Sequence, residues 1–162
     1  SCTGADEMDH SRWRQVLGLF TMNKVLKACA ALLLLAFAAP AHAATLVARV
    51  DVASQKMTVM HHGDVLYEWK VSTGAEGFST PRGEFRPYRV HKMWLSRSYN
   101  SAPMPYAVFY DRGWAVHGTD AVAKLGMPAS HGCVRLDTPN AKIFYNLVRE
   151  YGAGNTRIIV EN

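Results

Sequence analysis

A cysteine and a histidine lie two positions apart in the stretch Ser130-His131-Gly132-Cys133, and these residue types can carry out nucleophilic chemistry. A cysteine becomes an effective nucleophile at neutral pH when a base or a cation lies beside it. A second histidine, His117, lies 16 positions before the cysteine, at the end of an apolar run. The sequence therefore supplies one candidate nucleophile, Cys133, and two candidate bases, His117 and His131.

The backbone around the cysteine suits acyl transfer. Gly132 permits a tight turn and the close approach of a substrate. The amides of Gly132 and Cys133 are candidate donors of an oxyanion hole. The base must come within about 3 Å of the thiol. Sheet pairing would bring His117 there, whereas His131 is already close along the chain, so the residues by themselves leave the choice of base open.

Two other roles remain open for these side chains. A single cysteine can be a small buried apolar residue, and a single histidine can be a core residue with its hydrogen bonds satisfied. One cysteine and two histidines can also bind Zn²⁺ and leave a fourth position open. The spacing of His131 and Cys133 is poor for chelation. We therefore favour a catalytic thiol and expect neither a metal nor a cofactor.

The beginning of the chain predicts export. A short basic segment at residues 22–27 precedes an apolar run at 28–39 and an A-x-A cleavage site that ends at Ala43. This order is typical of a secretory signal peptide. The apolar run is shorter than the roughly 20 residues of a membrane-spanning helix. We expect residues 22–43 to be removed, with no stable membrane anchor left, and residues 1–21 to be a non-native or upstream extension.

The predicted mature domain, residues 44–162, keeps one of the three cysteines, because Cys2 and Cys29 precede it. A single cysteine cannot form an internal disulfide, and a free thiol is a liability in an oxidising compartment. Cys133 is therefore favoured as a functional residue of a protein in the periplasm or cell wall. The domain is mildly basic, with 14 Lys and Arg against 10 Asp and Glu. These charges are scattered, so we expect no nucleic acid as a partner.

The pattern of the mature chain is mostly β. Alternating apolar and polar residues predict strands at 45–52, 56–61 and 65–71. Further strands are predicted at 84–90, at 105–110 and 114–117 on either side of the turn Asp111-Arg112-Gly113, and at 156–160. A C-terminal helix is predicted to start at Asp137-Thr138-Pro139 and to end at Gly152. A minor short helix is expected at 120–125.

Residues 91–103 have no clean period and contain Trp94 and Tyr99, which predicts a long loop. Such a loop is either a lid over a site or an ordinary surface crossover.

Several motifs together resemble the L,D-transpeptidase catalytic domain, the YkuD family. They are His117-Gly118-Thr119, Leu125-Gly126-x-Pro128-x-Ser130-His131-Gly132-Cys133-Val134-Arg135-Leu136, Ser72-Thr73-Gly74, Thr80-Pro81-x-Gly83 and Met104-Pro105-Tyr106. The resemblance covers most of residues 45–160. It implies a mostly β, sandwich-like fold with a catalytic cysteine in a cleft.

The resemblance also implies a reaction on peptidoglycan stem peptides. The thiolate attacks the third residue of a tetrapeptide stem, the terminal D-Ala leaves, and the amine of a second stem resolves the thioester into a 3→3 cross-link. By resemblance Cys133 is the nucleophile, His117 is the base, and the carbonyl of Gly118 is the third member of the site. His131 is expected to shape the acceptor side or the oxyanion site.

Two further residues of the motif have expected roles. Ser130 is expected to support the turn by hydrogen bonding. Arg135 is expected either to meet a substrate carboxylate or to brace the loop.

The acceptor in this reaction stays open. Water as acceptor would make the protein an L,D-carboxypeptidase, and another amine would make it an enzyme that attaches or detaches a wall-bound protein. A non-catalytic wall-binding or zinc-binding module is the remote alternative.

Overall fold

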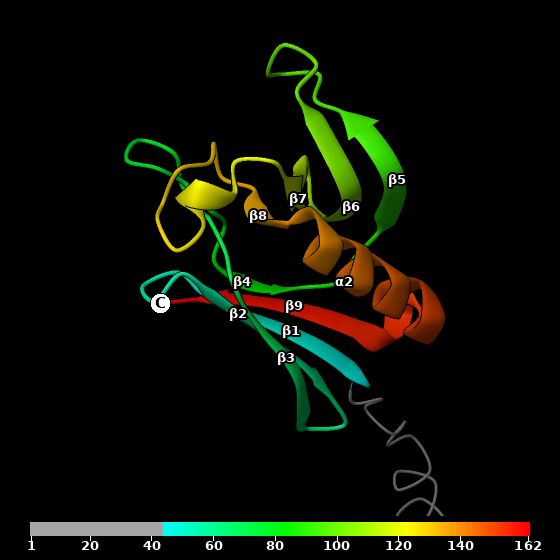
Figure 1. Ribbon diagram of the computed structural model, residues 1–162. Helices are drawn as coiled ribbons and strands as arrows, with labels where there is room; N and C mark the ends of the chain where they lie inside the picture. Colours follow the sequence, from blue (N-terminus) through cyan, green and yellow to red (C-terminus); the bar gives the residue numbers. More distant parts are fainter. Residues whose placement is uncertain (1–43) are drawn as a thin grey trace, which may run out of the picture. The chain divides into compact units, whose positions relative to one another are not determined.

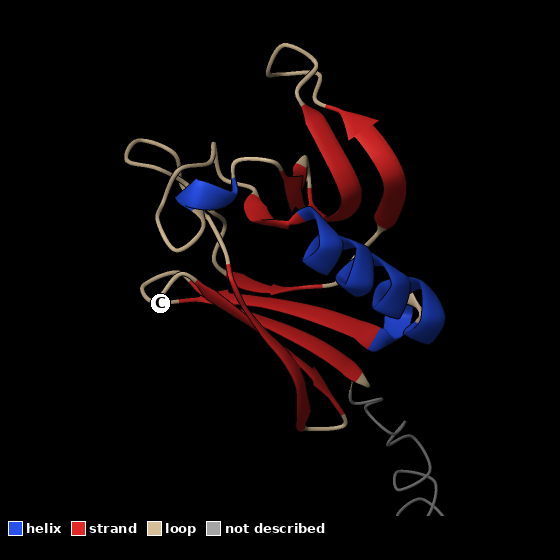
Figure 2. Ribbon diagram, viewed as in Figure 1, coloured by secondary structure: helices blue, strands red, loops and turns tan. Residues whose placement is uncertain are grey.

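The described part of the chain forms two β-sheets and one long helix (Figure 1). The computed structural model describes residues 44–162. The expected extension (1–21) and signal peptide (22–43) lie outside the described residues. The mostly β architecture with a C-terminal helix, predicted from the sequence, is confirmed (Figure 2).

The first sheet holds the first three strands, the closing strand and one short strand. In spatial order these are β3 (Asp64–Lys70), β2 (Lys56–His61), β1 (Leu46–Asp51), β9 (Thr156–Glu161) and β4 (Gly83–Phe85). The first three strands form an antiparallel meander, and β9 returns parallel to β1.

The second sheet carries the chemistry-bearing residues. It consists of β5 (Arg89–Leu95), β6 (Pro103–Asp111), β7 (Trp114–Thr119) and β8 (Val134–Asp137), in this order. A parallel pair formed by β7 and β8 places His117 opposite Arg135. Because Val134 pairs with Val116 in this parallel register, Cys133, the residue before β8, lies beside Ala115 near the beginning of β7.

Helix α2 (Thr138–Tyr151) follows β8 directly and packs against β6, β7 and β8 (Figure 1). Its buried side chains are Ala141, Phe144, Tyr145 and Val148. Asp137 precedes the helix as predicted, but its carboxylate forms no capping hydrogen bond. Two short 3₁₀ turns, Val122–Lys124 and Ala153–Asn155, complete the described elements.

The predicted strand at 84–90 is wrong as a single element. The structure has two strands there, because β4 pairs with β9 in the first sheet and β5 pairs with β6 in the second. Between them lies Pro87, which has no N–H for a ladder and interrupts the strand. The predicted loop at 91–103 is correspondingly too long, since β5 extends to Leu95 and β6 begins at Pro103.

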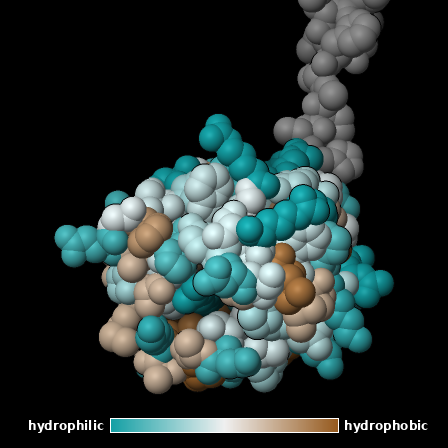
Figure 3. Space-filling model, turned by 90° about the horizontal axis from the view of Figure 1, so that it is seen from above, coloured by the Kyte–Doolittle hydropathy of each residue, from teal (hydrophilic) through white to brown (hydrophobic). Residues whose placement is uncertain are grey.

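The main core lies among β1, β2, β6, β7, β8, β9 and the buried face of α2. A smaller cluster of Met104, Ala107, Phe109 and Ala115 lies on the second sheet, and Trp94 and Cys133 pack against it. Seen from above, the hydrophobic residues on the surface form separate patches (Figure 3). Within residues 44–162, no helix is both long enough and apolar enough to span a bilayer.

Candidate active site

The side chain of His117 is buried in β7, with 6% of its surface exposed. Its Nδ1 atom lies 2.7 Å from the carbonyl oxygen of Gly118. Because a carbonyl oxygen only accepts hydrogen bonds, Nδ1 must carry the proton. The neutral ring therefore leaves Nε2 as an unprotonated acceptor, which is the form a general base needs.

Gly118 allows the start of the helix and β6 to approach the histidine closely. A Cβ atom at this position would lie 2.8 Å from Oγ1 of Thr138 and 3.1 Å from Cγ of Pro105. Thr138 is the first residue of α2, and Pro105 lies in β6. The absence of a side chain at Gly118 therefore lets two neighbouring elements fix the backbone that holds His117.

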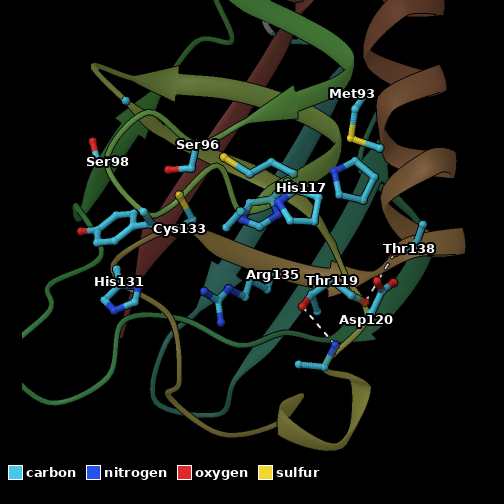
Figure 4. Close-up of a pocket in the computed structure, with 17 residues that line it drawn as sticks. Met93, Ser96, Ser98, His117, Thr119, Asp120, His131, Cys133, Arg135 and Thr138 are labelled. Atoms are coloured by element: carbon cyan, nitrogen blue, oxygen red, sulfur yellow. Dashed lines mark hydrogen bonds between the residues drawn. The ribbon is translucent and has the colours of Figure 1, made fainter.

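The thiol of Cys133 and the ring of His117 line one cavity of about 560 Å³ (Figure 4). Cys133 is half-buried and packs against the small cluster that contains Met104 and Ala115. His117 and Cys133 are 16 positions apart in the sequence, and the parallel pairing of β7 with β8 brings them together. One side of the thiol is thus held by apolar packing, and the other side faces the cavity.

The turn that presents the thiol is held by the hydroxyl of Ser130. This hydroxyl donates to the carbonyl oxygen of Cys133 at 2.6 Å and accepts the N–H of Gly132 at 3.0 Å. Ser130 is buried, so these bonds are shielded from water. The supporting role predicted for Ser130 agrees with this geometry. The amide of Gly132, one of the two candidate oxyanion donors, is thus bonded to Ser130 in this structure.

Gly132 adopts a backbone conformation that favours glycine, with φ of +112°. A Cβ atom there would lie 2.5 Å from Nε1 of Trp114 and 2.8 Å from the carbonyl oxygen of Ser79. The turn before Cys133 is therefore enclosed by an indole ring and a backbone carbonyl. Neither Trp114 nor Ser79 was predicted as part of the site, because their proximity depends on long-range packing.

Replacing Ser130 by alanine is expected to destabilise the fold and to slow acylation of Cys133. The change leaves the N–H of Gly132 without its partner in a buried turn, which costs about 1–3 kcal/mol. Urea unfolding would measure the stability, and the rate of covalent labelling by a β-lactam would measure the site. The exposed Ser54, which lies outside the lining of this cavity, provides a matched Ser→Ala control. An unchanged unfolding midpoint and labelling rate in Ser130→Ala would contradict the bracing role.

Arg135 both braces the loop and lines the cavity. Its Nη1 donates to the carbonyl oxygen of Ala129 at 3.2 Å, and its side chain borders the same cavity as Cys133. One of the two roles expected for this residue, that of a brace, is therefore seen directly. The second role, binding a substrate carboxylate, is compatible with its place in the cavity wall (Figure 4).

His131 is exposed and lies between two aromatic rings. Its ring stacks on Tyr99 with a centroid distance of 4.2 Å, and Phe78 meets it edge-on at 4.5 Å. Tyr99 belongs to the turn at residues 96–102, which borders the cavity. Phe78 was not predicted as a neighbour of the site, because nothing in its local sequence distinguishes it from other loop aromatics.

Burial keeps both candidate catalytic groups uncharged. It lowers the pKa of His117 to about 4, the Gly118 carbonyl opposes the shift, and the Arg135 cation adds to it. Burial also raises the pKa of the Cys133 thiol, while the Ala115 backbone and Arg135 lower it. At neutral pH the resting pair is therefore a thiol and a neutral imidazole rather than an ion pair.

The described part of the chain holds no group of three or more His, Cys, Asp or Glu side chains placed to bind a metal ion. In particular, Cys133, His117 and His131 do not form such a group.

Comparison with known proteins identifies the domain. The sequence model of the YkuD family, described as the L,D-transpeptidase catalytic domain, matches residues 46–160. The chain belongs to this family. The match covers both sheets, helix α2 and all the motif residues of the cavity.

Relatives of this L,D-transpeptidase domain support the assignment. YciB of Bacillus subtilis (strain 168), which is named as an L,D-transpeptidase, is 28% identical over 127 residues, covering 68% of this chain and 63% of that protein. An L,D-transpeptidase from Mycobacterium smegmatis has a similar fold, with a TM-score of 0.66 at 24% identity, covering 73% of this chain and 59% of that chain.

A third similar structure contains a ligand. L,D-transpeptidase 3 from Mycobacterium tuberculosis, solved with a faropenem-derived adduct, has a TM-score of 0.62 at 21% identity, covering 73% of this chain and 60% of that chain. The L,D-transpeptidase domain described here thus spans about 60% of the length of these relatives.

Proposed function

We propose that this chain is an exported peptidoglycan L,D-transpeptidase with Cys133 as nucleophile and His117 as general base. The proposal is carried by one observation. His117 is held by the Gly118 carbonyl with its free Nε2 in the cavity that Cys133 also lines. Membership of the L,D-transpeptidase family supports the reaction class.

In the first half-reaction the sulfur of Cys133 attacks the carbonyl carbon of the third stem residue. The thiol proton moves to Nε2 of His117. The Gly118 carbonyl accepts a hydrogen bond from Nδ1–H and so stabilises the resulting imidazolium. The amide of Cys133 is the candidate donor to the developing oxyanion, since the Gly132 amide is engaged by Ser130. The imidazolium then protonates the leaving nitrogen. The bond between the carbonyl carbon and this nitrogen breaks, D-Ala departs, and a thioester on Cys133 remains.

In the second half-reaction an amine of another stem attacks the thioester. His117 takes the amine proton and returns it to the sulfur of Cys133, which restores the thiol and leaves a 3→3 cross-link. Arg135 is suited to hold a stem carboxylate, and His131 with its aromatic neighbours shapes the entrance. If water replaces the amine, the same acyl-enzyme gives L,D-carboxypeptidase activity, and an amine of a wall-attached protein gives attachment.

The proposal assigns the parts of the chain as follows. Residues 44–162 are the catalytic domain, residues 22–43 are a cleaved signal peptide, and residues 1–21 are an upstream or non-native extension. The protein would then act in the periplasm or cell wall, where peptidoglycan is the partner.

The rate of acylation is expected to be constant from about pH 8 to pH 5 and to fall as the pH drops through about 4. Burial lowers the pKa of His117, so the neutral, base-competent form persists well below the pH at which a solvent-exposed histidine is protonated. The rate of covalent labelling by a β-lactam as a function of pH checks this expectation. An inflection near pH 6.5 would show that His117 titrates like an exposed histidine and would contradict the buried-base account.

Incubation of the protein with disaccharide-tetrapeptides tests the proposed function. Mass spectrometry should detect release of D-Ala and formation of a dimer joined through its third residues. Tripeptide without dimer would assign the carboxypeptidase reaction instead. Absence of both D-Ala release and dimer would overturn the proposal.

A further inference from the structure

The cavity contains one fixed cation and one carboxylate. Of the residues that line it, Arg135 carries the permanent positive charge and Asp120 is the single acidic residue. Asp120 is exposed, and among the described residues its carboxylate takes part in no ion pair or side-chain hydrogen bond. The carboxylate is thus free to attract a ligand, and no ion pair or side-chain hydrogen bond among the described residues gives it a structural role.

Asp120 lies close in the chain to the proposed base, His117. Asp120 follows directly after β7, three residues beyond His117, and the hydroxyl of Thr119 accepts the backbone N–H of Ala121 at 3.2 Å. Figure 4 shows Asp120 beside Thr138 on one side of His117, while Cys133 and His131 lie on the other. The cavity therefore has a thiol end and a carboxylate end, with the imidazole between them.

In the proposed reaction, a carboxylate at this end of the cavity would attract the cationic amines that take part. One imidazole protonates the departing amine and deprotonates the attacking amine, so both amines must pass the His117 side of the thioester. A primary amine exists mainly as an ammonium ion at neutral pH. A carboxylate at the mouth of a partly apolar cavity raises the local concentration of such a cation. Water is uncharged and gains nothing from it.

We propose that Asp120 is a specificity-determining residue that draws cationic primary amines into the acceptor side of the cavity in preference to water. This inference rests on the proposed function. Asp120 acts on capture of the acceptor and takes no part in formation of the acyl-enzyme. Asp120 therefore lowers the KM for the amine and leaves kcat unchanged.

Asp120→Asn is expected to raise the KM for ethanolamine, which is cationic at pH 7.5, by about three-fold at low salt, with kcat unchanged. Asp120→Lys is expected to raise it by about ten-fold. Both effects should shrink at 0.5 M NaCl, because salt screens exposed charges. Hydroxylamine, which is uncharged at this pH, should show no change. The amounts of amine adduct and tripeptide formed from a disaccharide-tetrapeptide, measured over a range of amine concentrations, give KM and kcat for each amine.

Glu76→Gln is the matched control, because Glu76 is an exposed carboxylate outside the lining of this cavity. It should leave both KM values unchanged. Faropenem labelling and D-Ala release, measured on every variant, separate the two proposals. Their absence in the unmodified protein would defeat the proposed function. Normal labelling with the same ethanolamine KM in Asp120→Asn, Asp120→Lys and Glu76→Gln would defeat the role of Asp120 alone.

Discussion

Replacing Cys133 by alanine is expected to abolish D-Ala release, with a loss of about 10⁴-fold or more in rate. The reason is chemical, since the alanine side chain offers no atom to form the thioester. The side chain is half-buried against a small apolar cluster, so the loss of one sulfur atom should perturb the fold little. Release of D-Ala from a disaccharide-tetrapeptide, followed by mass spectrometry, measures the effect.

A second substitution separates chemistry from packing. Cys133→Ser keeps a side chain of similar size and a hydroxyl, but serine is far harder to deprotonate beside a neutral imidazole. It should be as inactive as the alanine variant while its thermal unfolding stays close to that of the unmodified protein. Residual turnover in Cys133→Ala above the level of the Cys133→Ser variant would show that another group supplies the nucleophile.

Replacing His117 by alanine is expected to slow acylation by about 10²- to 10⁴-fold. The pKa of the Cys133 thiol is raised by burial, so the resting thiol is protonated and needs a base when it attacks. Arg135 lowers that pKa somewhat, which leaves a residual rate that does not depend on His117. The rate constant for labelling by faropenem, read from the mass of the intact protein, measures the loss.

His131→Ala is the control for this prediction, because His131 is exposed and stacks on Tyr99 at the rim of the cavity. Its labelling rate should stay within a few-fold of normal. The reverse pattern, with a near-normal rate in His117→Ala and a severe loss in His131→Ala, would move the base role to His131.

The local features of the fold were predictable from the sequence. The strands β1 and β2 follow the alternation of apolar and polar residues, and α2 follows its proline and terminal glycine. Local patterns of this kind are set by residues that are neighbours in the chain. The residue types and the family motif likewise single out Cys133 and His117 as the proposed catalytic pair, and the structure places both in the wall of one cavity.

Features set by distant contacts were not predictable. The break at Pro87 sends β4 and β5 into different sheets, and only the partner strands β9 and β6 decide this. The Gly132 amide, one of the two expected oxyanion donors, is bonded to the hydroxyl of Ser130. The geometry of this bond depends on the φ angle of Gly132, which the local sequence does not predict.

The aromatic neighbours of His131 likewise come from two separate loops. Phe78 lies in the segment that follows β3, and Tyr99 lies in the turn between β5 and β6. Their meeting at one histidine is a property of tertiary packing.

Peptide mapping of the acyl-enzyme tests the central claim most directly. The protein is quenched in acid during turnover of a disaccharide-tetrapeptide, digested and analysed by mass spectrometry. The account predicts that the peptide containing Cys133 gains the mass of the donor without its terminal D-Ala, and that hydroxylamine removes this increment. Product formation with an adduct on another residue, or with the Cys133 peptide unmodified throughout turnover, would contradict it.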